Sequence, residues 1–214
     1  MKAMMLWEPE RMEMVELPLR PLREGEVLLK VEACSICGSD LEGLHGWHPK
    51  MTYPRVMGHE AASTVAEVGP GVTTLSVGDR VAGVGKGPCG ACPACREGRV
   101  DDCQAPGGLG FGAHGAYAEY MISSTDDLTL IPDGVTFVQA AVAQPAGIAR
   151  HAVATRAAIQ PGELVLIQGC GPIGLSAMML SKLQGARVIS TDIVNYRCDF
   201  AQELGADLVL NAHR

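Results

Sequence analysis

Four cysteines lying close together place the strongest constraint on what this chain can fold into. Cys89, Cys92, Cys95 and Cys103 fall within fifteen residues, with the spacing Cys-x2-Cys-x2-Cys-x7-Cys. Four thiolates at this spacing can close a tetrahedral shell around one Zn²⁺ ion, and a shell filled by the protein leaves no position for a substrate. The run therefore predicts a structural zinc site, and any chemistry must lie elsewhere in the chain.

Two other interpretations of the cysteines are weaker. Iron–sulfur proteins also use close cysteine runs, but in the bacterial pattern the fourth cysteine is nearer and proline follows it. Here Gln104 follows the fourth cysteine. Disulfide bonds belong mainly to oxidising compartments. Because the chain starts with Met-Lys-Ala-Met and has no signal peptide, we expect a cytoplasmic protein with reduced thiols.

Charge and hydropathy argue against two classes of partner. The chain has 214 residues, of which 47% are hydrophobic, and a net charge of −7. This acidic balance does not suit nucleic acid or a polybasic membrane-binding surface. No apolar stretch approaches the roughly eighteen residues of a membrane span. We therefore expect neither a nucleic-acid partner nor a membrane partner.

The first 140 residues or so read as short strands separated by turns. Apolar or alternating runs occur at 2–7, 26–34, 61–68 and 117–122, and glycine- and proline-containing turn signals lie between them. This pattern predicts a strongly bent, β-barrel-like domain. Residues 86–110 contain the cysteines and six glycines. We expect them to form a protruding lobe that is held by the metal rather than by a core.

After this region the pattern changes to strands that alternate with helices. The compact apolar run at 163–168 suits a buried parallel strand, and 187–191 and 207–210 suit two more. Helices are expected between them, at 175–184 and 195–204. This β-α-β-α-β order is the first half of a doubly wound parallel sheet. The predicted fold class is thus α/β plus β.

A glycine motif lies between the first of these strands and its helix. Gly169, Gly171 and Gly174 permit a tight turn, the approach of a pyrophosphate and close packing of helix on strand. The helix N-terminus offers free N–H groups to phosphate. Asp192 ends the next strand, where its carboxylate can bind a ribose 2′-hydroxyl and repel a 2′-phosphate, which favours NAD over NADP. The alternative is an ordinary glycine-rich turn, with Asp192 capping the following helix.

Two short segments in the first half form a second constellation. They are Cys37-Gly-Ser-Asp40 and Gly58-His-Glu60. Cysteine and histidine suit Zn²⁺, and a catalytic zinc keeps one coordination position open. Each segment alone is weak evidence, because a lone cysteine is usually a buried apolar residue and a lone histidine is usually a hydrogen-bonded core residue.

Taken in order, the two short segments, the four cysteines and the glycine motif with its later aspartate resemble the zinc-dependent medium-chain alcohol dehydrogenase family. The resemblance runs through essentially the whole chain and is closest to the branch of polyol (sorbitol-type) and threonine dehydrogenases. It implies a GroES-like catalytic domain at 1–145, with the zinc lobe at 86–110, and the first half of a Rossmann domain at 146–214. It also implies one catalytic and one structural zinc, an alcohol or ketone substrate, NAD and a homo-oligomeric full-length protein.

The resemblance assigns roles to individual residues. Ser39 would start the proton relay, Asp40 would orient the ligands, and Glu60 would be a ligand or a neighbour that exchanges with water or substrate. The implied metal ligands are Cys37, His59, Glu60 and Gln144 at the catalytic zinc and Cys89, Cys92, Cys95 and Cys103 at the structural zinc. The implied cofactor contacts are Gly169, Gly171, Pro172, Ile173, Gly174, Asp192 and Arg197.

The chain departs from the family pattern at three places. Gln144 stands where the branch usually has glutamate. Because it offers an amide oxygen but no charge, we expect weaker zinc affinity or a more electrophilic zinc. The alternative is that Gln144 is not a ligand. Glu42 stands where a relay histidine is frequent, and His45 is the alternative end of the relay. The sequence also stops at Arg214, after the third strand of the nucleotide domain, which predicts a C-terminally truncated dehydrogenase.

These observations leave two functions from different classes. The leading hypothesis is a zinc-dependent oxidoreductase that oxidises a secondary alcohol, such as a polyol or a hydroxy amino acid, to a ketone with hydride transfer to NAD. The alternative is a zinc-stabilised nucleotide-binding fragment without dehydrogenase activity. A third interpretation keeps the family but reverses the physiological direction to ketone reduction.

Overall fold

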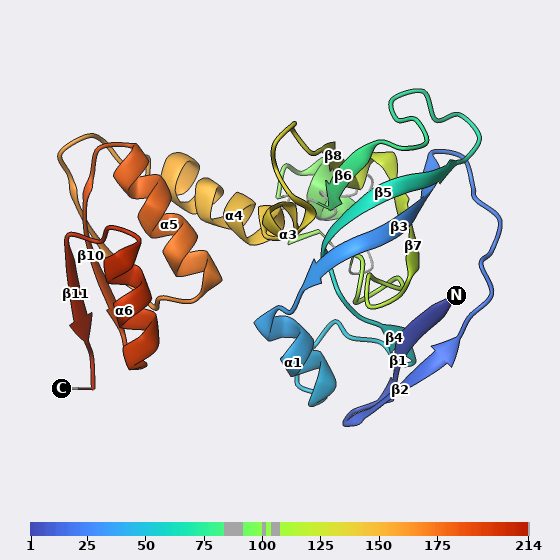
Figure 1. Cartoon of the computed structure of the whole chain (residues 1–214), viewed down its shortest axis with the longest axis horizontal. Coiled ribbons are helices and arrows are strands. Elements are labelled where there is room, and N and C mark those ends of the chain that lie inside the picture. The colour runs from blue at the N-terminus through green and yellow to red at the C-terminus, as the bar shows by residue number, and fades with distance from the viewer. Residues whose placement is uncertain (84–91, 100–101, 104–107, 214) are drawn as a thin grey trace. The chain divides into compact units, whose positions relative to one another are not determined.

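The computed structural model describes residues 1–83, 92–99, 102–103 and 108–213, which form two compact units (Figure 1). The first unit spans Met1–Ala143 and the second spans Gln144–Arg214. The domain boundary expected from the sequence, after residue 145, lies two residues beyond Ala143.

The first unit contains a five-stranded antiparallel sheet in the order β7-β3-β5-β6-β8. Its strands are β3 (Glu26–Ser35), β5 (Glu60–Val68), β6 (Arg80–Gly83), β7 (Tyr120–Ser124) and β8 (Leu128–Leu130). The alternate residues Val27 and Leu29 of β3 are fully buried, where they cluster with Val65, Val81 and Met121. Alternation between a buried and an exposed face thus creates the core of this unit.

A smaller antiparallel sheet packs beside it in the same unit, in the order β2-β1-β4. It consists of β1 (Lys2–Glu8), β2 (Arg11–Glu16) and β4 (Arg55–Val56). The predicted strands at 2–7, 26–34 and 61–68 are confirmed as β1, β3 and β5.

The fourth predicted strand, at 117–122, begins too early. Strand β7 starts only at Tyr120. The backbone N–H of Tyr117 instead donates to the Met57 carbonyl, and its own carbonyl accepts from Met4. Tyr117 therefore joins β1 to the segment before β5, and the chain pairs with β3 only after this crossing.

The first unit also contains short helices, of which the last follows its final strand. They are α1 (Gly38–Leu44), α2 (Pro93–Arg96), the 3-10 turn η2 (Thr125–Asp127) and α3 (Phe137–Ala141). Helix α1 starts directly after Cys37, whose backbone N–H donates to the Asp40 carboxylate at 2.9 Å. A side-chain acceptor at this position satisfies an N–H of the first turn and sets where the helix begins.

The second unit carries the predicted β-α-β-α-β pattern. After α4 (Ala143–Arg150) and a π-helical turn, η3 (His151–Arg156), come β9 (Leu164–Gln168), α5 (Pro172–Leu183), β10 (Arg187–Asp192), α6 (Asn195–Glu203) and β11 (Leu208–Asn211). The three strands are parallel, in the order β11-β10-β9. This is the partial Rossmann sheet that the sequence predicts.

Helices α5 and α6 cover the same face of the parallel sheet (Figure 1). Val188 of β10 is fully buried against Met178 of α5 and Ala201 of α6. The opposite face carries exposed leucines, namely Leu164, Leu166, Leu208 and Leu210. Across the residues that the structure describes, no helix is both long enough and apolar enough to cross a membrane.

Candidate metal and nucleotide sites

Three of the predicted ligands of the catalytic zinc come together at one end of the large sheet. Ligand atoms of Cys37, His59 and Glu60 lie within 4.8 Å of one another. Strand pairing explains why, because Ser35 at the end of β3 is directly opposite Glu60 at the start of β5. Cys37 follows Ser35 by two residues and His59 precedes Glu60. The strand register therefore places Cys37 and His59 at the same end of the sheet.

The buried carboxylate of Asp40 connects the two segments that carry these ligands. Its Oδ2 accepts hydrogen bonds from the Cys37 N–H at 2.9 Å and from the Tyr117 hydroxyl at 2.8 Å. Its Oδ1 accepts from the Gly58 N–H at 3.4 Å and lies 3.6 Å from Nδ1 of His59. Burial alone would raise the pKa of Asp40, but His59, the Cys37 N–H and the Tyr117 hydroxyl outweigh it, so the pKa is lowered.

The surroundings of His59 fit a metal ion. Its Nδ1 is buried and has no hydrogen-bond partner among the described residues, although the Asp40 carboxylate faces it. A carboxylate behind one ring nitrogen is the usual arrangement of a metal-binding histidine, since it leaves Nε2 available to the metal. Together with a thiol and a second carboxylate, this donor set suits Zn²⁺.

Two neighbours complete the environment of the cluster. The Ser35 hydroxyl donates to Oε2 of Glu60, which is only 6% exposed. Cys34, the next-to-last residue of β3, packs against the core of the first unit. Burial, with the charge of Asp40, raises the pKa of Cys34 to about 12. Its thiol therefore stays protonated at neutral pH, unlike a reactive cysteine.

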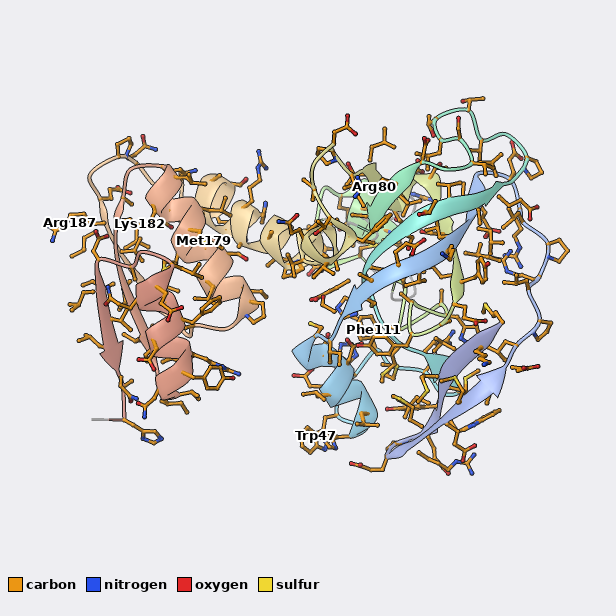
Figure 2. The ribbon with its side chains drawn as sticks, in the orientation of Figure 1. Trp47, Arg80, Phe111, Met179, Lys182 and Arg187 are labelled. Atoms are coloured by element: carbon orange, nitrogen blue, oxygen red, sulfur yellow. The ribbon has the colours of Figure 1, made fainter. Side chains whose placement is uncertain are left out.

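Two aromatic residues near the cluster were not predicted from the sequence. The ring of Phe111, which is labelled in Figure 2, stacks on His48 with centroids 4.4 Å apart and lies 5.0 Å from the ring of His59. Tyr117 donates to Asp40, as described above, and burial together with Asp40 raises the pKa of Tyr117, so its hydroxyl keeps its proton. Their only signal in the sequence is that two aromatics occur in a glycine-rich segment before β7.

The other predicted residues of this site are less closely tied to the cluster. Ser39 is half-buried in the first turn of α1, and its relay role stays a prediction. Gln144 is the second residue of α4 and belongs to the second unit, so its ligation also stays a prediction. Of the two alternative relay ends, Glu42 is exposed, and Nδ1 of His45 is 2.5 Å from Oε1 of Glu10.

The cysteine run also converges as far as the structure describes it. Sγ atoms of Cys92, Cys95 and Cys103 lie within 4.8 Å of one another. Helix α2 begins at Pro93, directly after Cys92, and its single turn brings Cys95 back towards Cys92. Cys89 and much of the lobe expected at 86–110 lie outside the described residues. The three described thiols fit the predicted tetrahedral site.

The glycine motif has the backbone that a nucleotide loop requires. Gly169 has φ +98°, a conformation that disfavours other residues. A Cβ on Gly174 would lie 1.9 Å from the Gly169 carbonyl oxygen, so this helix residue must be glycine for α5 to pack on the loop. A Cβ on Gly171 would meet nothing within 4 Å. The open space there matches a position where a phosphate approaches the backbone, and Pro172 and Ile173 follow as the first residues of α5.

Asp192 fixes the loop to the end of β10. Its Oδ2 accepts from the Cys170 N–H at 2.7 Å and its Oδ1 accepts from the Val194 N–H at 2.9 Å. The Cys170 hydrogen bond is the main reason why the pKa of Asp192 is lowered. Arg197 Nη1 is 3.9 Å from the same carboxylate. Each carboxylate oxygen has a further lone pair, so Asp192 can still accept from a ribose hydroxyl.

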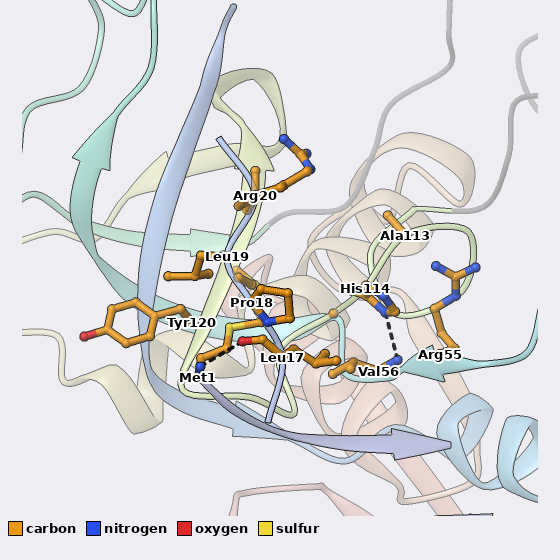
Figure 3. A pocket seen from close by; sticks show the side chains of 13 residues that line it. Met1, Leu17, Pro18, Leu19, Arg20, Arg55, Val56, Ala113, His114 and Tyr120 are labelled. Atoms are coloured by element: carbon orange, nitrogen blue, oxygen red, sulfur yellow. Dashed lines mark hydrogen bonds between the residues drawn. The ribbon is translucent and has the colours of Figure 1, made fainter. Parts of the chain in front are cut away.

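A separate cavity of about 450 Å³ lies in the first unit and contains none of the predicted site residues. Leu17, Pro18 and Met121 contribute to its apolar wall, and Arg55 and His114 lie together at one end (Figure 3). Nδ1 of His114 accepts from the Val56 N–H at 3.1 Å. Burial and the charge of Arg55 lower the pKa of His114.

Comparison with known proteins agrees with this architecture. The alcohol dehydrogenase GroES-like domain family matches residues 23–133. An alcohol dehydrogenase of Geobacillus stearothermophilus is 37% identical over 95% of this chain and 60% of its own length. An L-threonine 3-dehydrogenase of Shewanella woodyi is 36% identical over 99% of this chain and 63% of its own length.

Solved structures of related oxidoreductases also match this chain. Acetophenone reductase from Geotrichum candidum, in complex with NAD, superposes with a TM-score of 0.87 and 34% identity, over 99% of this chain and 63% of the reductase. This chain thus spans about 60% of the length of the relatives that it matches.

Proposed function

Because this chain belongs to the zinc-type medium-chain alcohol dehydrogenase family, we propose that it is the zinc- and NAD-binding part of an oxidoreductase. The reaction is oxidation of a secondary alcohol to a ketone, with hydride transfer to NAD. The observation that carries this proposal is the convergence of Cys37, His59 and Glu60 at the edge of the large sheet.

Each residue of this cluster has a part in the proposed chemistry. Cys37 and His59 would hold a zinc ion, which would supply the Lewis acidity that makes an alcohol easier to deprotonate. Asp40 keeps the His59 ring in the orientation needed for ligation. Ser39, in the first turn of α1, accepts the proton that the alcohol loses. Glu60, whose carboxylate Ser35 hydrogen-bonds, is the ligand that exchanges with water or substrate.

The glycine loop and Asp192 form the proposed cofactor site. Gly171 and the N-terminus of α5 bind the pyrophosphate, and Asp192 accepts from the ribose 2′-hydroxyl. The buried, ionised carboxylate of Asp192 would repel a 2′-phosphate, which supports NAD. Arg197 is the group that could compensate for that repulsion, because its guanidinium lies 3.9 Å from Asp192. A comparison of NADH with NADPH binding therefore belongs in any test.

A polyol or a hydroxy amino acid is the proposed substrate class. One relative is named an L-threonine 3-dehydrogenase, and threonine is a secondary alcohol. The Phe111 ring beside His59 gives the cluster one apolar wall. Because acetophenone reductase is named for the reverse reaction, ketone reduction is the second direction to measure.

The test is alcohol-dependent NADH formation, followed by absorbance, with threonine, sorbitol and 2-propanol. We expect turnover of at least one secondary alcohol, and its loss in Cys37→Ala. Cys34→Ala is the matched control, because this cysteine lies three residues away in the same segment and is not a proposed ligand. Equal activity of Cys37→Ala and the parent chain would contradict the proposal.

The rival function is a zinc-stabilised nucleotide-binding protein without dehydrogenase activity. Gln144, which brings no charge to the metal, is the feature that favours it. NADH binding without turnover of any alcohol or ketone, in a protein shown to contain two zinc ions, would favour this alternative.

A further inference from the structure

Tyr117 carries a half-buried hydroxyl that the proposed chemistry does not use. It lies 77 positions from Asp40 in the sequence, yet its hydroxyl donates to Oδ2 of Asp40 at 2.8 Å. The Ser35 carbonyl is its only other acceptor among the described residues, at 3.4 Å. A hydroxyl has a single proton, so the shorter bond to the charged oxygen takes it.

Asp40 needs this bond because its carboxylate has to hold one orientation. The terminal torsion of an aspartate has a broad, roughly two-fold preference, so hydrogen bonds decide how the carboxylate is turned. The Cys37 N–H and the Tyr117 hydroxyl both donate to Oδ2. With Oδ2 held in this way, Oδ1 faces the Gly58 N–H and Nδ1 of His59.

Tyr117 is itself held firmly from several sides. Its backbone N–H donates to Met57 at 2.9 Å, and its carbonyl accepts from Met4 at 2.8 Å. Its ring lies against Gly58, where an added Cβ would come within 2.7 Å of Cδ1 of the ring. The hydroxyl therefore reaches Asp40 from a residue whose backbone is hydrogen-bonded to β1 and to the segment between β4 and β5.

We propose that Tyr117 is a positioning residue of the metal site: through Asp40 it orients His59 for ligation. The inference rests on the proposed zinc site at Cys37 and His59 and adds a residue to its support. It predicts that removal of one hydroxyl, without loss of the ring, weakens metal binding at that site and leaves the cysteine lobe unchanged.

The experiment is a Co²⁺ titration of the metal-free chain, followed by visible absorption. The difference between the parent chain and Cys37→Ala isolates the spectrum of the Cys37 site from that of the lobe. Tyr117→Phe is expected to weaken Co²⁺ binding at the Cys37 site on the order of tenfold, the lower end of what outer partners of metal ligands contribute. Asp40→Asn is expected to weaken it at least as much.

Tyr53→Phe is the matched control. The Tyr53 hydroxyl donates to the Gly43 carbonyl of α1 at 2.6 Å, so this variant also loses one tyrosine hydrogen bond to the same helix but does not touch Asp40. It should bind Co²⁺ as the parent chain does. In the double variant, Tyr117→Phe should add little to Asp40→Asn, because both changes act through one carboxylate.

The outcomes separate this inference from the proposed function. Unchanged affinity of Tyr117→Phe at a site that the parent chain fills would overturn the inference alone. Equal weakening at the Cys37 site and at the lobe would overturn it too, since this would indicate damage to the fold. A parent chain with the same spectrum as Cys37→Ala would overturn both the inference and the proposed zinc site.

Discussion

Two aspartates, one in each unit, hold nearby backbone segments together in a similar way. Asp40 accepts from the Cys37 and Gly58 N–H groups, and Asp192 accepts from the Cys170 and Val194 N–H groups. Both carboxyl pKa values are lowered. A lowered pKa means that ionisation favours the folded state, so this stability is present above the unfolded pKa of about 4 and is lost as the pH falls.

For His114, in contrast to the two aspartates, we expect the folded state to favour the uncharged form. Its Nδ1 can accept the Val56 N–H only while it is unprotonated, and partial desolvation of the ring, with the charge of nearby Arg55, lowers its pKa. In the unfolded chain, histidine binds a proton near pH 6.5. The unfolded state then holds more protons, so stability falls as the pH drops below about 6.5. Melting temperatures from pH 8 to pH 5 should fall more steeply for the parent chain than for His114→Asn, which keeps an oxygen acceptor that does not titrate.

A control histidine makes this measurement specific. His151 lies in the second unit and takes no part in the hydrogen bond between His114 and Val56, so His151→Asn should follow the pH profile of the parent chain. Parallel profiles for His114→Asn and the parent chain would show that the His114–Val56 hydrogen bond carries no pH-dependent stability.

At the scale of the elements, two glycines of the glycine loop are expected to have different roles, one in folding and one in ligand binding. In Gly174→Ala the new methyl group would lie 1.9 Å from the Gly169 carbonyl oxygen. We expect a loss of stability of about 3 kcal/mol, the upper end of the usual cost of overpacking. In Gly171→Ala the methyl group meets no atom of the described residues within 4 Å, its chain neighbours aside. It would occupy the proposed phosphate position, so stability should be kept while NADH affinity falls by at least about tenfold, or about 1.4 kcal/mol.

Urea unfolding followed by circular dichroism, and NADH titration followed by fluorescence, distinguish the two glycines. The expected pattern is an unstable Gly174→Ala variant and a stable Gly171→Ala variant that binds NADH poorly. Full NADH affinity in a folded Gly171→Ala variant would argue that the phosphate does not approach the backbone here.

Regular elements with strong periodicity could be predicted from the sequence, and irregular ones could not. The segments at 163–168 and 187–191 are apolar runs bounded by glycine or charged residues, and they are confirmed as β9 and β10. The sequence pattern places Tyr117 in a strand because it begins an apolar or alternating run. Its backbone partners, Met4 and Met57, lie 113 and 60 positions away, and local pattern carries no information about such distant pairing.

The same limit applies to the metal site. Cys37 and His59 were assigned from short motifs and from a family resemblance, and the Ser35–Glu60 register then explains why they meet. Phe111 and Tyr117 reach the site from an irregular segment far along the chain. Whether Gln144 joins the ligands depends on the placement of one unit against the other, which neither periodicity nor motif spacing determines.

At the scale of the whole molecule, the two clusters of potential metal ligands differ in their donor atoms. The described thiols of the lobe form an all-sulfur set, which is typical of a structural zinc, whereas the Cys37 cluster combines sulfur, nitrogen and oxygen donors, which is the kind of set expected at a catalytic zinc. The account of this chain as the zinc- and NAD-binding part of a dehydrogenase depends on the second cluster being a true metal site.

Zinc content per chain, measured after removal of loosely bound metal, tests this claim most directly. The account predicts two zinc ions in the parent chain and one in Cys37→Ala, because the substitution removes a ligand from one site only. A single zinc ion in both proteins would contradict it, since the cysteine lobe alone would then hold metal.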